Sequence, residues 1–152
     1  MRHYCRGKGK GGVWYDGYYI RMTAGSHYIF PEYNDNKLQE VDKNTITEYT
    51  NLYDKNDVEI CEGDIVQLKY RKNESASEVG VVKFGEYKFN RYDEFPRYLG
   101  YYISVKKLVD VVEVPLDGKI SISLIDVIYN GEVEIIGNIF DNPELLELSK
   151  GD

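Results

Sequence analysis

The residues best suited to metal or nucleophilic chemistry are two histidines, His3 and His27, and two cysteines, Cys5 and Cys61. A zinc site needs several such ligands at short, regular spacings, and here His3 and Cys5 form one isolated pair in a segment expected to be mobile. Cysteine catalysis needs a base beside the thiol, whereas Cys61 lies in a short apolar phrase that favours packing. The sequence therefore predicts no metal site and no catalytic cysteine.

Carboxylates are abundant, and four of them stand beside turns or helix ends: Glu62, Asp64, Asp126 and Asp141. At such positions an acidic side chain already accepts hydrogen bonds from the backbone. Acid–base catalysis needs two carboxylates at a distance that spacing along the chain does not supply. A carboxylate-based hydrolase is therefore the least favoured hypothesis, and we expect no catalytic residue and no cofactor.

The segment 7–12, Gly-Lys-Gly-Lys-Gly-Gly, is similar in composition to a phosphate-binding loop. Such a loop follows a buried strand, precedes a helix and carries a Lys-Ser/Thr pair or a comparable spacing, and these features are missing around the segment. Its composition predicts a flexible loop instead.

Charge is distributed unevenly along the chain. Residues 1–25 carry a net charge of +4, and since the whole chain carries −7, the remaining residues carry −11. An acidic body repels phosphate backbones, whereas non-specific nucleic-acid binding needs a positive face. We expect residues 1–12 to form a flexible basic arm, which is either solvated or docks on an acidic neighbour such as another copy of the chain.

Aromatic residues crowd the stretch 87–102, where they alternate with cations. The aromatic residues are Tyr87, Phe89, Tyr92, Phe95, Tyr98, Tyr101 and Tyr102, and the cations are Lys88, Arg91 and Arg97. This pattern is found on platforms that stack single-stranded nucleic acid, and also in tyrosine-rich interfaces and ordinary sheet packing. Because Asp93 and Glu94 interrupt it, packing or self-association is the favoured interpretation.

Trp14, beside a cluster of tyrosines, is expected to anchor a core or an interface. Together these observations define a candidate interaction surface, which consists of Arg6, Lys8, Lys10, Trp14, Tyr92, Tyr98 and Tyr101.

Length and composition favour a mainly β protein with one domain. A chain of 152 residues can bury a core of its own, about 70% of the surface that it exposes when unfolded. Valine, isoleucine and tyrosine dominate its apolar residues, and these types suit pleated, half-buried sheets. Two unpaired cysteines, with neither a secretory signal nor a membrane-spanning apolar run, favour a reducing, cytoplasmic setting without membrane contact.

Turn residues divide the chain into short predicted strands. Asp16-Gly17 predicts a two-residue hairpin turn between strands 13–15 and 18–22. Further strands are expected at 27–30, ending at Pro31, and at 46–50, 65–70, 79–85, 101–105 and 108–114. Asp54 to Asp57 and Gly63 are predicted turns.

The C-terminal third is predicted to combine strand and helix. Residues 120–130 fit a strand or a short helix, and Ser121 as a cap and Gly131 beyond the end favour the helix. Residues 133–140 predict a strand bent at Gly137. Asn142 followed by Pro143 predicts the start of a last short helix.

Three phrases together are similar to one known family: Tyr4-Cys5-Arg6-Gly7-Lys8 with Trp14 and Gly17-Tyr18-Tyr19, residues 50–66, and residues 133–146. They resemble the YopX family of phage and prophage proteins, whose function is uncharacterised. The resemblance runs through nearly the whole chain and is weakest over residues 70–130. It implies a single YopX-like domain over residues 1–152 and a setting in the cytoplasm of a bacterial host.

The implied fold is mainly β: a partly open β-barrel or curved sheets with SH3-like hairpin elements and one or two short helices. Within it we expect a basic arm at 1–12, a central hairpin region at 45–70 and 79–90, and a C-terminal strand and helix at 132–148. The likeness to SH3 barrels is one of fold and implies no activity.

Three functions follow as hypotheses. The favoured one is a non-enzymatic phage accessory protein that binds protein, most simply itself, so that a homo-oligomer or a phage or host partner is expected. The alternative is a nucleic-acid-binding module that uses the basic arm and the stretch 87–102. The third is the carboxylate-based hydrolase.

Overall fold

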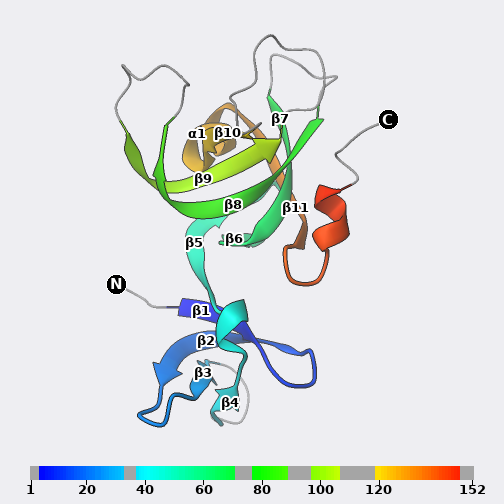
Figure 1. Cartoon of the computed structure of the whole chain (residues 1–152). Helices are drawn as coiled ribbons and strands as arrows, with labels where there is room; N and C mark the ends of the chain where they lie inside the picture. The colour runs from blue at the N-terminus through cyan, green and yellow to red at the C-terminus, as the bar shows by residue number, and fades with distance from the viewer. Residues whose placement is uncertain (1–3, 33–36, 71–76, 89–96, 107–118, 148–152) are drawn as a thin grey trace. The chain divides into compact units, whose positions relative to one another are not determined.

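The computed structural model describes residues 4–32, 37–70, 77–88, 97–106 and 119–147, and the chain divides into two compact units between residues 49 and 50 (Figure 1). The fold is mainly β, as expected, with two antiparallel sheets whose strand orders are open rather than closed into a barrel. Among the described residues there is one α-helix, of seven residues.

The first sheet has the order β4-β3-β2-β1-β5-β6, and β5 crosses the boundary between the units. Its strands are β1 (Tyr4–Lys8), β2 (Trp14–Arg21), β3 (His27–Pro31), β4 (Gln39–Glu40), β5 (Thr47–Tyr53) and β6 (Glu59–Cys61), with the 3-10 helix η1 (Lys43–Thr45) before β5. The predicted strands at 27–30 and 46–50 are confirmed, and β3 ends at Pro31.

The predicted hairpin turn at Asp16-Gly17 is wrong, because both residues lie inside β2. Gly17 is buried opposite Pro31, and a Cβ atom there would lie 2.0 Å from the carbonyl oxygen of Phe30. The glycine therefore serves close packing of β2 on β3 and not a turn.

The chain reverses earlier, between β1 and β2. The amide of Gly9 donates to the carbonyl of Val13 over 2.8 Å, and Gly12 has a φ of +78°. The prediction of a flexible basic arm is thus wrong for residues 4–12, which form β1 and this turn, while residues 1–3 lie outside the described part. Cys5, expected in a mobile segment, is buried in the small core of the first unit with Ile29 and Val41.

The second sheet has the order β10-β9-β8-β7-β11 and lies within the second unit. Its strands are β7 (Asp64–Tyr70), β8 (Ser77–Tyr87), β9 (Tyr98–Lys106), β10 (Lys119–Ser123) and β11 (Gly131–Asn138). The central pairing of β7 with β8 and the strand at 101–105 are confirmed. The predicted strand at 108–114 lies outside the described residues.

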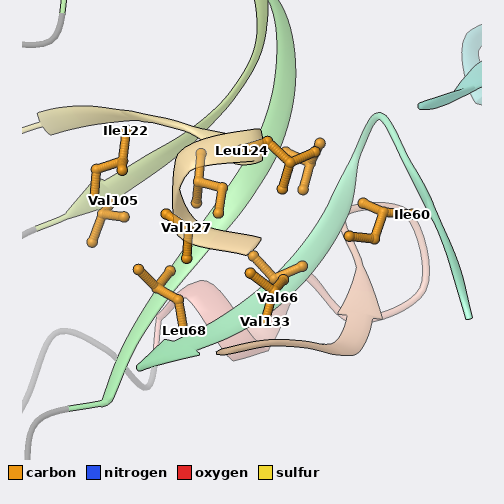
Figure 2. Close-up of a cluster of buried hydrophobic side chains, with 10 residues drawn as sticks. Ile60, Val66, Leu68, Val105, Ile122, Leu124, Val127 and Val133 are labelled. Atoms are coloured by element: carbon orange, nitrogen blue, oxygen red, sulfur yellow. The ribbon is translucent and has the colours of Figure 1, made fainter. Parts of the chain in front are cut away.

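Among the described residues, ten buried aliphatic side chains from the second sheet, from β6 and from α1 (Leu124–Asn130) form the core of the second unit (Figure 2). Leu124 and Val127 of α1 are fully buried, and the helix contacts β7, β9, β10 and β11. Residues 120–130 thus contain both predicted alternatives, because β10 runs to Ser123 and α1 follows. The cap is Ser123 and not Ser121, while Gly131 ends the helix as predicted.

Both predicted turns of the second unit are confirmed. Asp54 Oδ1 accepts hydrogen bonds from the amides of Asn56 and Val58, over 2.8 and 3.0 Å. Gly63 has a φ of +85°, in the left-handed region that glycine adopts without strain.

The C-terminal segment follows the prediction in outline. The pairing of β11 with β7 shifts register between Ile135 and Gly137, which gives the predicted irregularity at Gly137. Asn142 and Pro143 begin a short helix, η2 (Pro143–Leu146), which is a 3-10 helix. The Asn142 side chain accepts a hydrogen bond from the amide of Asn138, 3.3 Å away, and so braces the end of β11.

Candidate functional site

The basic residues predicted as an interaction surface contact partners within the first unit. Strand pairing places Lys8 opposite Trp14, and the Lys8 Nζ lies 5.9 Å from the indole ring centre. The guanidinium carbon of Arg6 lies 5.1 Å from the same ring, and its Nε donates to Thr47 Oγ1 over 3.3 Å. Lys10 pairs with Glu40 over 3.1 Å. An external anion would compete with these contacts for all three cations.

Trp14 lies on a face of the first sheet that carries further aromatic rings. The ring of Tyr4 packs against Tyr18 at 5.8 Å and against Tyr49 at 5.4 Å, and the Tyr49 hydroxyl donates to Asp16. Because Tyr4, Arg6 and Lys8 alternate along β1, they point to one side of the sheet. Trp14 is half-buried on this face, and the sequence-based assignment of this tryptophan to a core or an interface remains a prediction.

The predicted aromatic residues of the second unit do not form one surface. Tyr98 and Tyr101 both lie on β9 but have opposite parity, so their side chains leave opposite faces of the sheet. Tyr92 lies outside the described residues. The structure thus brings Arg6, Lys8 and Trp14 together and separates Tyr98 from Tyr101.

On one face, the apolar stripe of β8 and β9 continues from the core to the end of the strand pair. From the core outward, the opposing pairs are Val82 and Ile103, Phe84 and Tyr101, and Glu86 and Leu99. Phe84 is 52% exposed and Leu99 is 76% exposed, although Val82 and Ile103 are fully buried. We call Phe84, Leu99 and Tyr101 the apolar end.

A charged pair borders the apolar end, because Arg97 Nη1 lies 3.3 Å from Glu86 Oε2. The rings of Phe84 and Tyr101 pack edge to face, with centres 4.9 Å apart. Sequence reasoning missed Phe84 and Leu99. The available signal was the alternation of Val82, Phe84 and Glu86, which identifies a single face that runs beyond the buried positions.

The opposite face of the same strands carries a row of stacked tyrosines, which we call the tyrosine row: Tyr87, Tyr98 and Tyr102. The ring centre of Tyr87 lies 5.8 Å from that of Tyr98 and 5.0 Å from that of Tyr102. Tyr102 is opposite Ser123 on β10, so this face leads directly to the beginning of α1. A cavity of about 230 Å³ lies here, lined by Tyr87, Tyr98, Ser123 and Asp126.

The buried carboxylates of the second unit, Asp54 and Asp64, accept hydrogen bonds from backbone amides. Asp64 Oδ2 accepts from the amide of Cys61 over 2.8 Å, which confirms the capping role expected for Asp64. Asp54 Oδ2 accepts from the amide of Ile135 over 3.0 Å, in addition to its two turn contacts. Asp126 and Asp141 accept instead from asparagine side chains, those of Asn130 and Asn138.

Other ionisable groups follow their surroundings. At the surface, Lys55 Nζ lies 2.7 Å from Glu134 Oε2. This hydrogen bond lowers the pKa of Glu134 and raises the pKa of Lys55. Burial, with a smaller contribution from Glu48, raises the pKa of Cys5 to about 11. Such a thiol is a poor nucleophile at neutral pH. Within the described ranges, no group of three or more His, Cys, Asp or Glu residues is arranged to hold a metal ion.

The described helices include none that is both long and apolar enough to cross a membrane.

The family model described as YopX protein matches residues 14–147, which is most of the chain, so the chain belongs to the YopX family. No curated protein and no solved structure gives a significant match.

Proposed function

We propose that this member of the YopX family is a non-enzymatic accessory protein of a phage or prophage, which binds protein and most simply a second copy of itself. The observation that carries the proposal is the apolar end, where Leu99 is 76% exposed beside Phe84. Contiguous apolar side chains at the surface of a soluble protein mark sites of association.

The arrangement around the apolar end fits a symmetric interface. Apolar and aromatic residues lie at its centre and the pair Glu86 and Arg97 lies at its border, as in interfaces with an apolar core and a polar rim. In a two-fold dimer the same surface meets itself. Glu86 of one copy could then pair with Arg97 of the other, so the border needs no second protein to be complementary.

The test is the mass of the protein in solution, measured by sedimentation velocity over a range of concentrations. We expect a monomer–dimer equilibrium for the natural chain and the monomer mass of 17.7 kDa for Leu99→Lys. The introduced lysine stands opposite Glu86, so it forms a favourable cross-strand pair in the monomer but buries a charge in the dimer.

The matched control is Tyr129→Lys, which introduces the same charged side chain at an equally exposed apolar site, 75% exposed on α1 and outside the apolar end. It should leave the equilibrium unchanged. A natural chain that sediments as a monomer at every concentration would refute self-association, and a dimer that persists in Leu99→Lys would exclude the apolar end as its interface.

Nucleic-acid binding is a second candidate, favoured by the half-buried Trp14 beside Arg6 and Lys8 on one sheet face. Stacking rings with neighbouring cations suit single strands. The net charge of −8 over residues 50–152 opposes it. Fluorescence anisotropy with a labelled single-stranded oligonucleotide at low salt is the test, and Arg6→Gln should weaken any binding and reduce its dependence on salt concentration.

A further inference from the structure

The cavity beside the tyrosine row has a size and lining that restrict what can enter it. Its volume of about 230 Å³ is smaller than the roughly 300–1,000 Å³ of pockets that bury drug-sized ligands. It therefore suits a single side chain or a small headgroup and not a nucleotide cofactor.

Among the described residues that line the cavity, two are aromatic and one carries a carboxylate. Tyr87 and Tyr98 supply the rings, Tyr102 stacks behind Tyr87, and Asp126 and Ser123 supply oxygen atoms. Aromatic faces attract cations through their negative quadrupole, and a carboxylate adds a full negative charge. The positive end of a helix dipole near Ser123 amounts to at most about half a charge, so the carboxylate outweighs it.

The Asp126 carboxylate accepts a hydrogen bond of 2.7 Å from Asn130 Nδ2 at its Oδ1, and the Asp126 amide donates to Ser123 Oγ over 3.4 Å. In the part of the chain that the structure describes, no ion pair includes Asp126. Lys83, which is opposite Tyr102 on the same face, is not among the residues that line the cavity. The carboxylate thus retains capacity to accept further hydrogen bonds.

We propose that this cavity binds a guanidinium group. A guanidinium is planar, so it stacks on a tyrosine ring, and its N–H groups form a fork that can donate two bonds to one carboxylate. An anion would be repelled by Asp126. A neutral aromatic ring would stack equally well, but it would take the carboxylate out of water without compensation. An ammonium group satisfies the charge but lacks the planar face.

The guanidinium can come from an arginine side chain of a bound protein or from a small free molecule. Both present the same head to the cavity, and the net charge of −8 over residues 50–152 attracts either source. The proposal is independent of self-association, because the tyrosine row and the apolar end lie on opposite faces of β8 and β9.

The experiment is a titration of the whole isotope-labelled chain, followed by the backbone amide resonances of Tyr87, Tyr98, Ser123 and Asp126. The probes are three capped tripeptides, which carry arginine, lysine or citrulline between glycines, and ethylguanidinium as the free guanidinium. Citrulline keeps the planar shape of arginine but has no charge. We expect saturable shifts with the arginine peptide and with ethylguanidinium, weaker binding of the lysine peptide, and binding of the citrulline peptide that is weaker by about tenfold or more.

Two variants complete the test. Asp126→Asn keeps an acceptor for Asn130 but removes the charge. This variant should bind the arginine peptide about tenfold more weakly than the natural chain. Glu132→Gln removes one exposed carboxylate of the same unit outside the cavity, and it should bind like the natural chain.

Each outcome decides the proposal. Equal binding of arginine and citrulline peptides, unchanged binding in Asp126→Asn, or shifts that avoid the cavity residues would overturn it. If it holds, tighter binding of the arginine peptide than of ethylguanidinium identifies a protein-borne arginine as the source, and the reverse identifies a small molecule. The mass of Asp126→Asn in solution should equal that of the natural chain, which separates this result from a failure of self-association.

Discussion

The sheets in the two units of the chain are stabilised by different kinds of contact. In the first unit three buried residues, Cys5, Ile29 and Val41, form the core, and cation–aromatic contacts and close backbone packing supplement it. In the second unit ten buried aliphatic residues form the core beneath α1. Residues 1–49 carry a net charge of +1, whereas residues 50–152 carry −8.

The two units also differ in what their surface side chains contact. In the first unit Arg6, Lys8 and Lys10 contact Trp14, Thr47 or Glu40, so these three cations contribute to the unit's own structure. In the second unit, which has an aliphatic core, the apolar stripe of β8 and β9 continues beyond the buried positions to the exposed Phe84 and Leu99. Both binding proposals, self-association and guanidinium binding, therefore concern the second unit.

The largest expected effect tests whether the cores are separate. Ile103→Ala removes a fully buried side chain from the second core and should lower the free energy of unfolding by about 3–4 kcal/mol. Hydrogen exchange should show faster exchange in β7, β8 and β9, while the amides of β1 and β2 keep their protection. Ile29→Ala, the matched change in the first core, should give the reverse pattern. Equal loss of protection in both units for either variant would show a single cooperative core.

Asp54→Ala should lower the free energy of unfolding by about 3 kcal/mol, nearly as much as the core substitution, because it removes the acceptor of three amides. Those amides belong to Asn56, Val58 and Ile135, so the change loosens both the turn and its link to β11. Chemical denaturation measures the loss. Asp54→Asn, which keeps one carbonyl acceptor, should lose less, and equal losses for the two variants would mean that the acceptor oxygen kept in Asp54→Asn contributes nothing.

Gly17→Ala should destabilise the first unit by about 2 kcal/mol. The new methyl group would lie 2.0 Å from the carbonyl oxygen of Phe30, which is backbone and cannot rotate away. Gly100→Ala in β9 of the second unit is the control, since an added Cβ there meets nothing within 4 Å. Thermal unfolding should separate the two variants, and similar melting temperatures would contradict the close packing of β2 on β3.

The error at Gly17 explains how far the sequence predicts the fold. Strands and turns whose cause is local, such as those at Asp54 and Gly63, were predictable because a side-chain acceptor or a positive φ acts within a few residues. Asp16-Gly17 has the same local sequence pattern as a turn, but the glycine is needed because the backbone of Phe30, thirteen residues away, packs closely against it. Only the pairing of β2 with β3 reveals that need.

The candidate site was less predictable than the fold for a related reason. The crowding of aromatic residues over 87–102 was visible in the sequence, but the sorting of Tyr98 and Tyr101 to opposite faces depends on strand parity and register. The sequence predicts that Asp126 caps backbone amides, whereas its place in the cavity follows from where β10 ends and α1 begins. If the boundary between β10 and α1 lay one residue away, the Asp126 side chain would point in another direction and would not line the cavity.

The smallest effect concerns Cys5 in the first core and depends on pH. Burial raises the pKa of this thiol from 9.0 to about 11, so the folded chain holds the proton more tightly than the unfolded chain. The stability that the neutral thiol contributes is therefore fully present below pH 9 and is lost between about pH 9 and pH 11, by about 1–2 kcal/mol. Urea unfolding at about pH 8 and pH 10.5 measures this loss, and comparison with Cys5→Ala subtracts the titration of other groups. Since Cys5 lies in the smaller core, exchange protection should fall first in β1 and β2, and an equal pH dependence in Cys5→Ala would show that the thiol's burial is not its source.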